Sequence, residues 1–331
     1  MIIKIDEKDK KILFQLQLDS RQTYSQIAKK VRLTKEVVRY RIKRLEDLRI
    51  ILQYTAVINA RKIGQESYRW YVQLENTDRK KLQSIIETLV ANPYCVWVAT
   101  CTGRWDLIAL FAAYSPRHFE ALRNAVLFKY SSNIREHQFA IALEVYFFKT
   151  QLFGTTETHT FSFPYWGGEE ERMALDEEDI KTLADFCKDP KQSTAGIARH
   201  HNFSFELTRN RILRMQKSGL IQGTSISINY ALLGFETYKV FFNLKKTGPE
   251  KDQELIRYLS SHPNAAEVIR CLGNWDIEFN LIVQNSFQYH EIMMELKDRF
   301  AGTISNYIST QVFDNFKYNL FSMADELLKK K

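Results

Sequence analysis

The chain lacks the features that mark membrane-spanning, secreted and zinc-stabilised proteins. Its longest apolar run, residues 107–114, is far shorter than the roughly 20 residues that span a bilayer. Residues 1–6 contain no apolar core of the kind a signal peptide needs. The four cysteines lie far apart without C-x-x-C spacing, which disfavours a structural zinc site and suits reduced thiols. We therefore expect a cytoplasmic globular protein with no metal and no membrane contact.

Sequence motifs of catalysis are absent as well. The chain has no G-x-S-x-G, no phosphate-binding Walker loop and no H-x-x-x-H, so we predict no enzyme activity and no cofactor. His200 and His201 are adjacent, and neighbouring residues of a helix point about 100° apart. We therefore expect this pair not to share a metal ion. The net charge of +8 permits a polyanionic partner without requiring one.

The sequence matches itself at a shift of 170 residues. Gly64 then meets Gly234, and the Cys-x-Gly-x-Trp-Asp segment that begins at Cys101 meets the one that begins at Cys271. The register holds without a gap from residue 6 to about residue 130 and then slips by two residues. Chance does not keep one register for so long, and the pattern predicts a tandem duplication.

Each copy begins with three short helical patterns. In the first copy they cover residues 9–18, about 24–31 and 35–48, with Thr34 as the expected N-cap of the third. Val38, Ile42 and Leu45 recur at helical spacing in this third helix, and most of its remaining surface is basic. Three short helices with a tight turn before a basic third helix indicate a helix-turn-helix.

The sequence beyond Gly64 follows the order β-α-β-β-α-β. This order predicts a ferredoxin-like module, a four-stranded antiparallel sheet with two helices on one face. The helices leave one sheet face bare, and we expect this face to be apolar and to pack on the second copy. The residues expected on it are Trp70, Val72 and Leu74, which alternate along one strand, and their counterparts Val240, Phe242 and Leu244. Residues 54–58 are expected to form a wing or a connecting strand.

The predicted fold class is therefore α+β: two copies of a winged helix-turn-helix plus a ferredoxin-like βαββαβ module, pairing sheet to sheet as an intrachain pseudo-dimer. The predicted helix-turn-helix domains cover residues 1–60 and 175–230, and the predicted α+β regulatory and dimerisation domains cover residues 64–150 and 234–321. Residues 151–174 read as a linker, since they contain glycines and an acidic run. Aromatic residues at 161–166 suggest that part of this linker pairs as a strand.

In order and spacing, these motifs resemble those of the Lrp/AsnC (leucine-responsive, asparagine-synthetase activator) family of prokaryotic transcription regulators. The residues that carry the resemblance are Asp6 to Leu13, Ile27-Ala28, Arg41 to Glu46, Gly64 and Gly103 to Asp106, with Arg211 to Arg214, Gly219 to Ile221, Gly234 and Gly273 to Asp276 in the second copy. The resemblance implies double-stranded DNA as a partner and a small effector, often an amino acid, near the Gly103–Asp106 turn. Further homo-oligomerisation is left open.

The recognition helices provide the predicted DNA contacts. These are Thr34, Lys35, Arg39, Tyr40, Lys43 and Arg44 in the first copy and Ser204, Arg209, Asn210 and Arg214 in the second. The resemblance further implies effector contacts at Gly103, Trp105, Asp106, Gly273, Trp275 and Asp276. Both turns also have a purely structural interpretation, a hairpin with a packed indole and a carboxylate that caps the turn.

The two helix-turn-helix modules differ in charge. Residues 6–60 contain 13 Lys and Arg against 7 Asp and Glu, whereas residues 176–230 contain 8 against 7. Because non-specific attraction to DNA grows with the phosphates neutralised, we expect the first module to supply most of the electrostatic affinity. The alternative is a degenerate second module that only completes the pseudo-dimer.

Two other functions fit a paired two-module scaffold. One is a siroheme decarboxylase-like enzyme of the haem pathway, which needs His and Arg groups that converge on a tetrapyrrole in the α+β modules. The matching strands, residues 95–99 and 265–269, contain no histidine. The other is an effector sensor whose helix-turn-helix modules no longer bind DNA, and the basic third helix argues against it.

Overall fold

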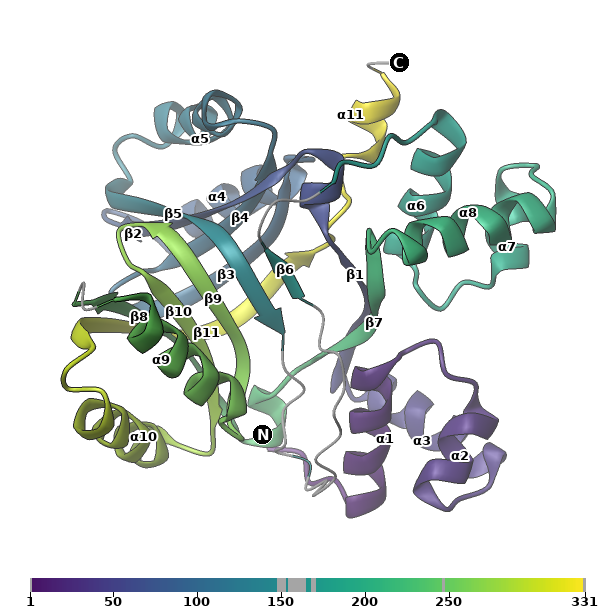
Figure 1. Ribbon diagram of the computed structural model, residues 1–331, viewed down its shortest axis with the longest axis horizontal. Coiled ribbons are helices and arrows are strands. Elements are labelled where there is room, and N and C mark those ends of the chain that lie inside the picture. Colours follow the sequence, from purple (N-terminus) through teal and green to yellow (C-terminus); the bar gives the residue numbers. More distant parts are fainter. Residues whose placement is uncertain (1, 148–152, 154–164, 168–170, 246–247, 330–331) are drawn as a thin grey trace.

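The computed structural model describes residues 2–147, 153, 165–167, 171–245 and 248–329. The same succession of elements occurs twice (Figure 1). The first copy contains α1 (Glu7–Leu18), α2 (Tyr24–Val31), α3 (Lys35–Asp47), β1 (Ile51–Ile58), β2 (Glu66–Leu74), α4 (Arg79–Ala91), β3 (Cys95–Gly103), β4 (Leu107–Ala113), α5 (Pro116–Lys129) and β5 (Ile134–Phe147). The second contains α6 (Glu177–Lys188), α7 (Thr194–His200), α8 (Phe205–Lys217), β7 (Ile221–Ile228), β8 (Glu236–Leu244), α9 (Pro249–Ser261), β9 (Ala265–Gly273), β10 (Ile277–Val283), α10 (Ser286–Arg299) and β11 (Ile304–Tyr318).

Side-chain caps fix where the helices of the first helix-turn-helix begin. Asp6 and Asp9 form a reciprocal capping box at the start of α1, and Thr23 and Gln26 form another at the start of α2. The second copy repeats the first of these boxes with Asp176 and Asp179. Each box satisfies backbone N–H groups that a helix start otherwise leaves without an intrahelical partner.

The two βαββαβ modules confirm the predicted ferredoxin-like order. The first sheet has the order β5-β2-β4-β3 and the second has the order β11-β8-β10-β9. The long strands β5 and β11 also continue into the other copy, where β5 pairs with β9 and β11 pairs with β3. The two sheets are thus joined at both edges, so the copies form one pseudo-dimer within the chain.

The sheet face that meets the other copy is not the one predicted. Trp70 and Val72 pack on their own helices α4 and α5, together with Ile86 and Phe119. The opposite face of β2 points inward, where Tyr71 packs edge-on against Phe241 and Trp275 of the second copy. In the second copy Val240, Phe242 and Leu244 likewise pack on α9 and α10. Both faces of β2 and β8 are buried. The alternating apolar residues in the sequence therefore could not show which face packs on the helices and which meets the other copy.

The strands that follow the recognition helices join the two copies a second time. β1 pairs antiparallel with β7, so residues 54–58 form a connecting strand. The first helix-turn-helix packs on Ile226 and Ile228 of β7. The second packs on Ala56 and Ile58 of β1. Figure 1 shows both helix-turn-helix modules on the same side of the paired sheets, at opposite ends of this ribbon.

Two shorter elements lie outside the repeat. β6 (Tyr165–Gly167) pairs with β5, which confirms that part of the linker segment forms a strand, although most of residues 151–170 lie outside the described residues. α11 (Ala324–Leu328), which the sequence did not predict, packs on α6. Among the described residues, no helix is both long enough and apolar enough to cross a membrane.

Candidate nucleic-acid interface

The recognition helix α3 presents a basic face that its packing does not use. Thr34 caps the helix by accepting a hydrogen bond from the N–H of Val37 at 3.3 Å. Val38, Ile42 and Leu45 are buried against α1 and α2. The face away from this stripe exposes four of the predicted contact residues, Lys35, Arg39, Tyr40 and Lys43. The Tyr40 side chain, 68% exposed, is free to approach a ligand.

Arg44 has a structural role that the sequence did not reveal. Its guanidinium contacts the Asp9 carboxylate at 2.5 Å, and Arg41 contacts the same carboxylate at 2.9 Å and Asp6 at 2.7 Å. Asp9 is fully buried. Partial burial favours a higher pKa for Asp6, but the Asp9 N–H and Arg41 lower that pKa below its usual range. These ion pairs hold α3 against the start of α1.

The recognition helix of the second copy, α8, has a different surface. Ser204 caps it by accepting from the N–H of Leu207 at 3.1 Å. Buried Thr208 donates its hydroxyl hydrogen to the Ser204 carbonyl, which explains how a polar residue replaces Val38. Exposed Phe205 and Leu213 stand where α3 has Lys35 and Lys43. Asn210 is exposed, Arg209 lies 3.7 Å from Glu206, and Arg214 contacts buried Asp179 as Arg44 contacts Asp9.

The two glycine turns predicted as effector contacts lie at the seams between the copies. Gly103 (φ +111°) lies against Ser309 of β11. A Cβ on Gly273 (φ +145°) would lie 2.7 Å from the carbonyl oxygen of Phe139 in β5, so this position requires glycine. Both indoles, Trp105 and Trp275, are buried between the sheets.

The turn aspartates bind backbone groups. Asp106 accepts a hydrogen bond from the N–H of Leu74 at 2.7 Å, and Asp276 accepts one from the N–H of Leu244 at 2.8 Å. Each carboxylate thus ties its turn to the neighbouring strand. These contacts give the turn residues a structural role, and effector binding by them stays a prediction.

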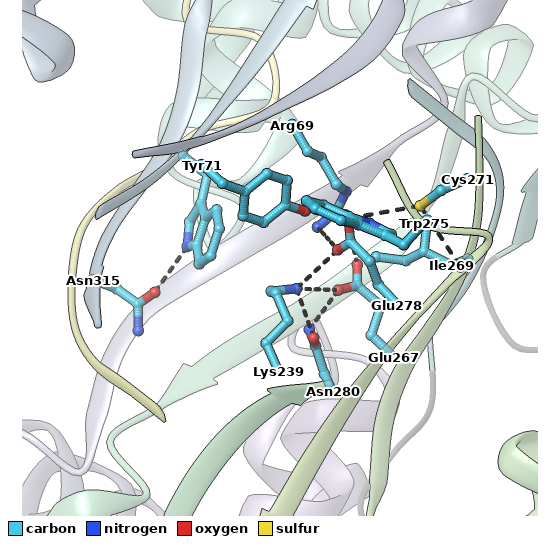
Figure 2. Close-up of polar contacts among 11 residues, drawn as sticks. Arg69, Tyr71, Lys239, Glu267, Ile269, Cys271, Trp275, Glu278, Asn280 and Asn315 are labelled. Atoms are coloured by element: carbon cyan, nitrogen blue, oxygen red, sulfur yellow. Dashed lines mark hydrogen bonds and ion pairs between the residues drawn. The ribbon is translucent and has the colours of Figure 1, made fainter. Parts of the chain in front are cut away.

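A buried charge network, which the sequence did not predict, crosses the interface between the sheets (Figure 2). Glu278 Oε2 lies 3.3 Å from both Arg69 Nη1 of the first copy and Lys239 Nζ of the second. Glu267 lies 3.2 Å from Arg69 Nη2. The Tyr71 hydroxyl donates to Glu278. Burial alone would raise the pKa of Glu278, but Arg69 and Lys239 lower it below the ordinary range.

The network is asymmetric although the scaffold is duplicated. Arg69 and Lys239 occupy matched positions 170 residues apart. The two carboxylates come only from the second copy, since the positions matching Glu278 and Glu267 are Ile108 and Trp97. The first copy has no carboxylate at these positions, so it could not form the network with a duplicate of itself. A charged residue in an otherwise apolar strand, with an apolar counterpart in the repeat, is the signal that could have revealed it.

The expectation that His200 and His201 point apart is wrong. His200 Nδ1 lies 2.6 Å and His201 Nε2 lies 3.1 Å from the same oxygen of Asp185. The 100° rule applies within a helix, but α7 ends at His200, and His201 is the residue after it. The two rings can therefore turn toward one carboxylate.

Comparisons with known proteins agree with this architecture. The AsnC-type helix-turn-helix domain matches residues 5–46. A protein named an HTH-type transcriptional regulator from Pyrococcus furiosus is 32% identical over 108 residues, which are 33% of this chain and 72% of that protein. The HTH-type transcriptional regulator LrpC of Bacillus subtilis is 31% identical over 98 residues, or 29% of this chain and 68% of LrpC. Each relative thus corresponds to about a third of this chain.

A solved structure matches the chain over its whole length. The crystal structure of the siroheme decarboxylase NirDL superposes with a TM-score of 0.60, covers 98% of both chains and is 14% identical. At this identity the match shows a shared fold alone. The sequence matches, together with the helix-turn-helix and ferredoxin-like modules, show that the chain belongs to the Lrp/AsnC family of helix-turn-helix transcriptional regulators.

Proposed function

We propose that this chain is a DNA-binding transcription regulator, built as a covalent pseudo-dimer, whose first helix-turn-helix supplies most of the affinity. The observation that carries the proposal is the exposed basic face of α3. Lys35, Arg39 and Lys43 are exposed there, and none of them is needed to bury the apolar stripe. In a helix-turn-helix, the N-terminal part of this helix contacts base edges, and basic side chains around it contact phosphates.

Replacing both Arg39 and Lys43 by alanine should weaken DNA binding without unfolding the chain. Removal of a side chain that contacts a base should cost about 1–3 kcal/mol of binding free energy. Binding to genomic fragments by gel shift or fluorescence anisotropy measures the change, and circular dichroism checks the fold. The double variant Lys251→Ala/Arg257→Ala is the matched control, because it removes the same charge from the exposed face of α9. If the α3 double variant and the α9 double variant bind DNA with equal affinity, α3 is not the recognition helix.

We propose further that a small effector, such as an amino acid, acts near the Gly103–Asp106 and Gly273–Asp276 turns. The support is positional, because both turns lie where a strand of one copy joins the sheet of the other. A ligand bound there would act on the pairing of the copies and hence on the spacing of the two recognition helices. Calorimetric titration with individual amino acids, with and without DNA, tests this. If the heats of injection equal those of the amino acid injected into buffer alone, the effector proposal is contradicted.

A siroheme decarboxylase-like activity is the second candidate, because the whole-chain match to NirDL favours it. Against it, β3 and β9 contain no histidine to face a tetrapyrrole. The spectrum of the chain mixed with an iron tetrapyrrole separates the two functions. The regulator proposal predicts no shift of the tetrapyrrole absorbance, and a stoichiometric shift followed by release of CO₂ would favour the enzyme.

A further inference from the structure

We propose that Asp185, His200 and His201 form a binding site for a divalent transition-metal ion in the second helix-turn-helix. Each side chain offers one ligand atom, and these atoms all lie within 4.8 Å of one another. Both imidazole nitrogens approach Asp185 Oδ2, His200 Nδ1 at 2.6 Å and His201 Nε2 at 3.1 Å. Two imidazoles and a carboxylate are ligands that suit zinc, nickel, copper or iron.

The backbone brings these three groups together. Asp185 lies near the end of α6, and His200 is the last residue of α7. His201 caps α7 with φ −104° and ψ 5°, and Asn202 then reverses the chain with φ 57°. In the first copy, α2 continues one residue further, to Val31. The earlier end of α7 is what releases the second histidine from helical geometry.

The spacing of the ligand atoms approaches that of a coordination site. Zinc binds imidazole nitrogen and carboxylate oxygen at about 2.0–2.2 Å, so the ligand atoms of a tetrahedral site lie roughly 3.3 Å apart. The separation of His201 Nε2 from Asp185 Oδ2, 3.1 Å, is close to this value, whereas that of His200 Nδ1, 2.6 Å, is clearly shorter. Because the His200 side chain is 62% exposed, its ring can rotate to lengthen the shorter separation.

His201 supplies a second, independent observation. Its Nε2 atom is buried and lies 3.1 Å from Asp185 Oδ2, but the geometry is not that of a hydrogen bond, and the atom makes no hydrogen bond with any other residue that the structure describes. Its ring stacks on Phe203 with centroids 5.4 Å apart, which holds the nitrogen toward Asp185. A buried nitrogen without a hydrogen bond is costly, and a metal ion at the carboxylate would satisfy it.

An ion can reach the site from solvent. His200 is 62% exposed, and it lines an open hollow of about 700 Å³ together with Asp185. Lys188, Asp189 and Arg199 line the same hollow, so the site also has two cations near it and one further carboxylate. Solvent can therefore fill the coordination positions that the protein leaves open.

The first copy cannot form the same site. The positions matching Asp185, His200 and His201 are Gln15, Lys30 and Val31. We therefore expect one ion per chain. It would tie the first helix of the second helix-turn-helix to the turn before α8, and so stabilise the module with the weaker positive charge.

Titration of the chain without an affinity tag, using Zn²⁺ alone against a chromophoric chelator, tests the proposal. Co²⁺ absorbance reports the coordination. We expect one equivalent of Zn²⁺, a Co²⁺ spectrum typical of mixed nitrogen and oxygen ligands, and a metal-dependent rise in Tm. His200→Ala and Asp185→Asn should each weaken binding by at least about 100-fold. His290→Ala, which removes an exposed histidine from α10, should leave the affinity unchanged.

His200→Ala is the decisive variant because the side chain is exposed and its removal should not affect folding. Binding of Zn²⁺ by this variant with wild-type stoichiometry and affinity would overturn the proposal. So would a wild-type chain whose Tm and chelator competition do not respond to Zn²⁺. DNA binding is not needed for either readout, so the result does not depend on the proposed regulatory function.

Discussion

Replacing Glu278 by glutamine should lower the free energy of unfolding by about 3–5 kcal/mol, the usual cost of breaking a buried ion pair. Glu278 is fully buried and contacts Arg69, Lys239 and Tyr71. Without its charge, both cations stay in the interface with only Glu267 to balance them. Urea unfolding measures the change, and Glu254→Gln on the exposed surface of α9 is the control. A decrease below about 0.5 kcal/mol, the size expected of a surface substitution, would show that the network does not hold the copies together.

The same variant should alter the dependence of stability on pH. The folded-state pKa of Glu278 is lowered, so its contribution is present above the usual titration range of glutamate, about 4.3, and is lost as the pH falls through the lower folded value. The difference between wild type and Glu278→Gln should therefore shrink in acid below about pH 4. A difference that stays constant down to acid unfolding would contradict this assignment.

Giving α3 the residues of α8, by Lys35→Phe and Lys43→Leu, should weaken DNA binding by about 1–3 kcal/mol for each side chain that contacts a base. The matched single variants Arg39→Ala and Arg209→Ala then compare the two modules at one helical position. We expect the larger effect from Arg39→Ala, because α3 exposes three cations at positions where α8 keeps Arg209 alone. Equal effects of the two single variants would mean that both modules contribute alike.

The duplicated fold could be predicted because its signals are local and occur twice. The stripe of Val38, Ile42 and Leu45 has helical spacing, and the caps at Thr34 and Ser204 mark helix starts. The order of strands and helices followed from the positions of turns and apolar runs. None of these features depends on how the copies meet.

The interface between the copies could not be predicted, because it depends on groups far apart in the sequence. β2 is buried on both faces, so Tyr71 and Trp70 look equivalent in the sequence although only Tyr71 reaches the second copy. Arg44 has the sequence pattern of a DNA contact, and only tertiary packing sets the position of Asp9, 35 residues earlier. The geometry of His201 depends on α7 ending at His200, and the sequence around these histidines does not mark that end.

The salt dependence of DNA binding is the measurement that most directly tests whether α3 binds DNA. The logarithm of the association constant should fall linearly with the logarithm of salt concentration between about 50 and 200 mM, with a slope near −0.9 for each phosphate contact. If Arg39 and Lys43 contact phosphates, the double alanine variant should bind more weakly with a slope smaller by roughly 1.8. A wild-type chain that does not bind duplex DNA, or a double variant with unchanged affinity and slope, would contradict the proposed function.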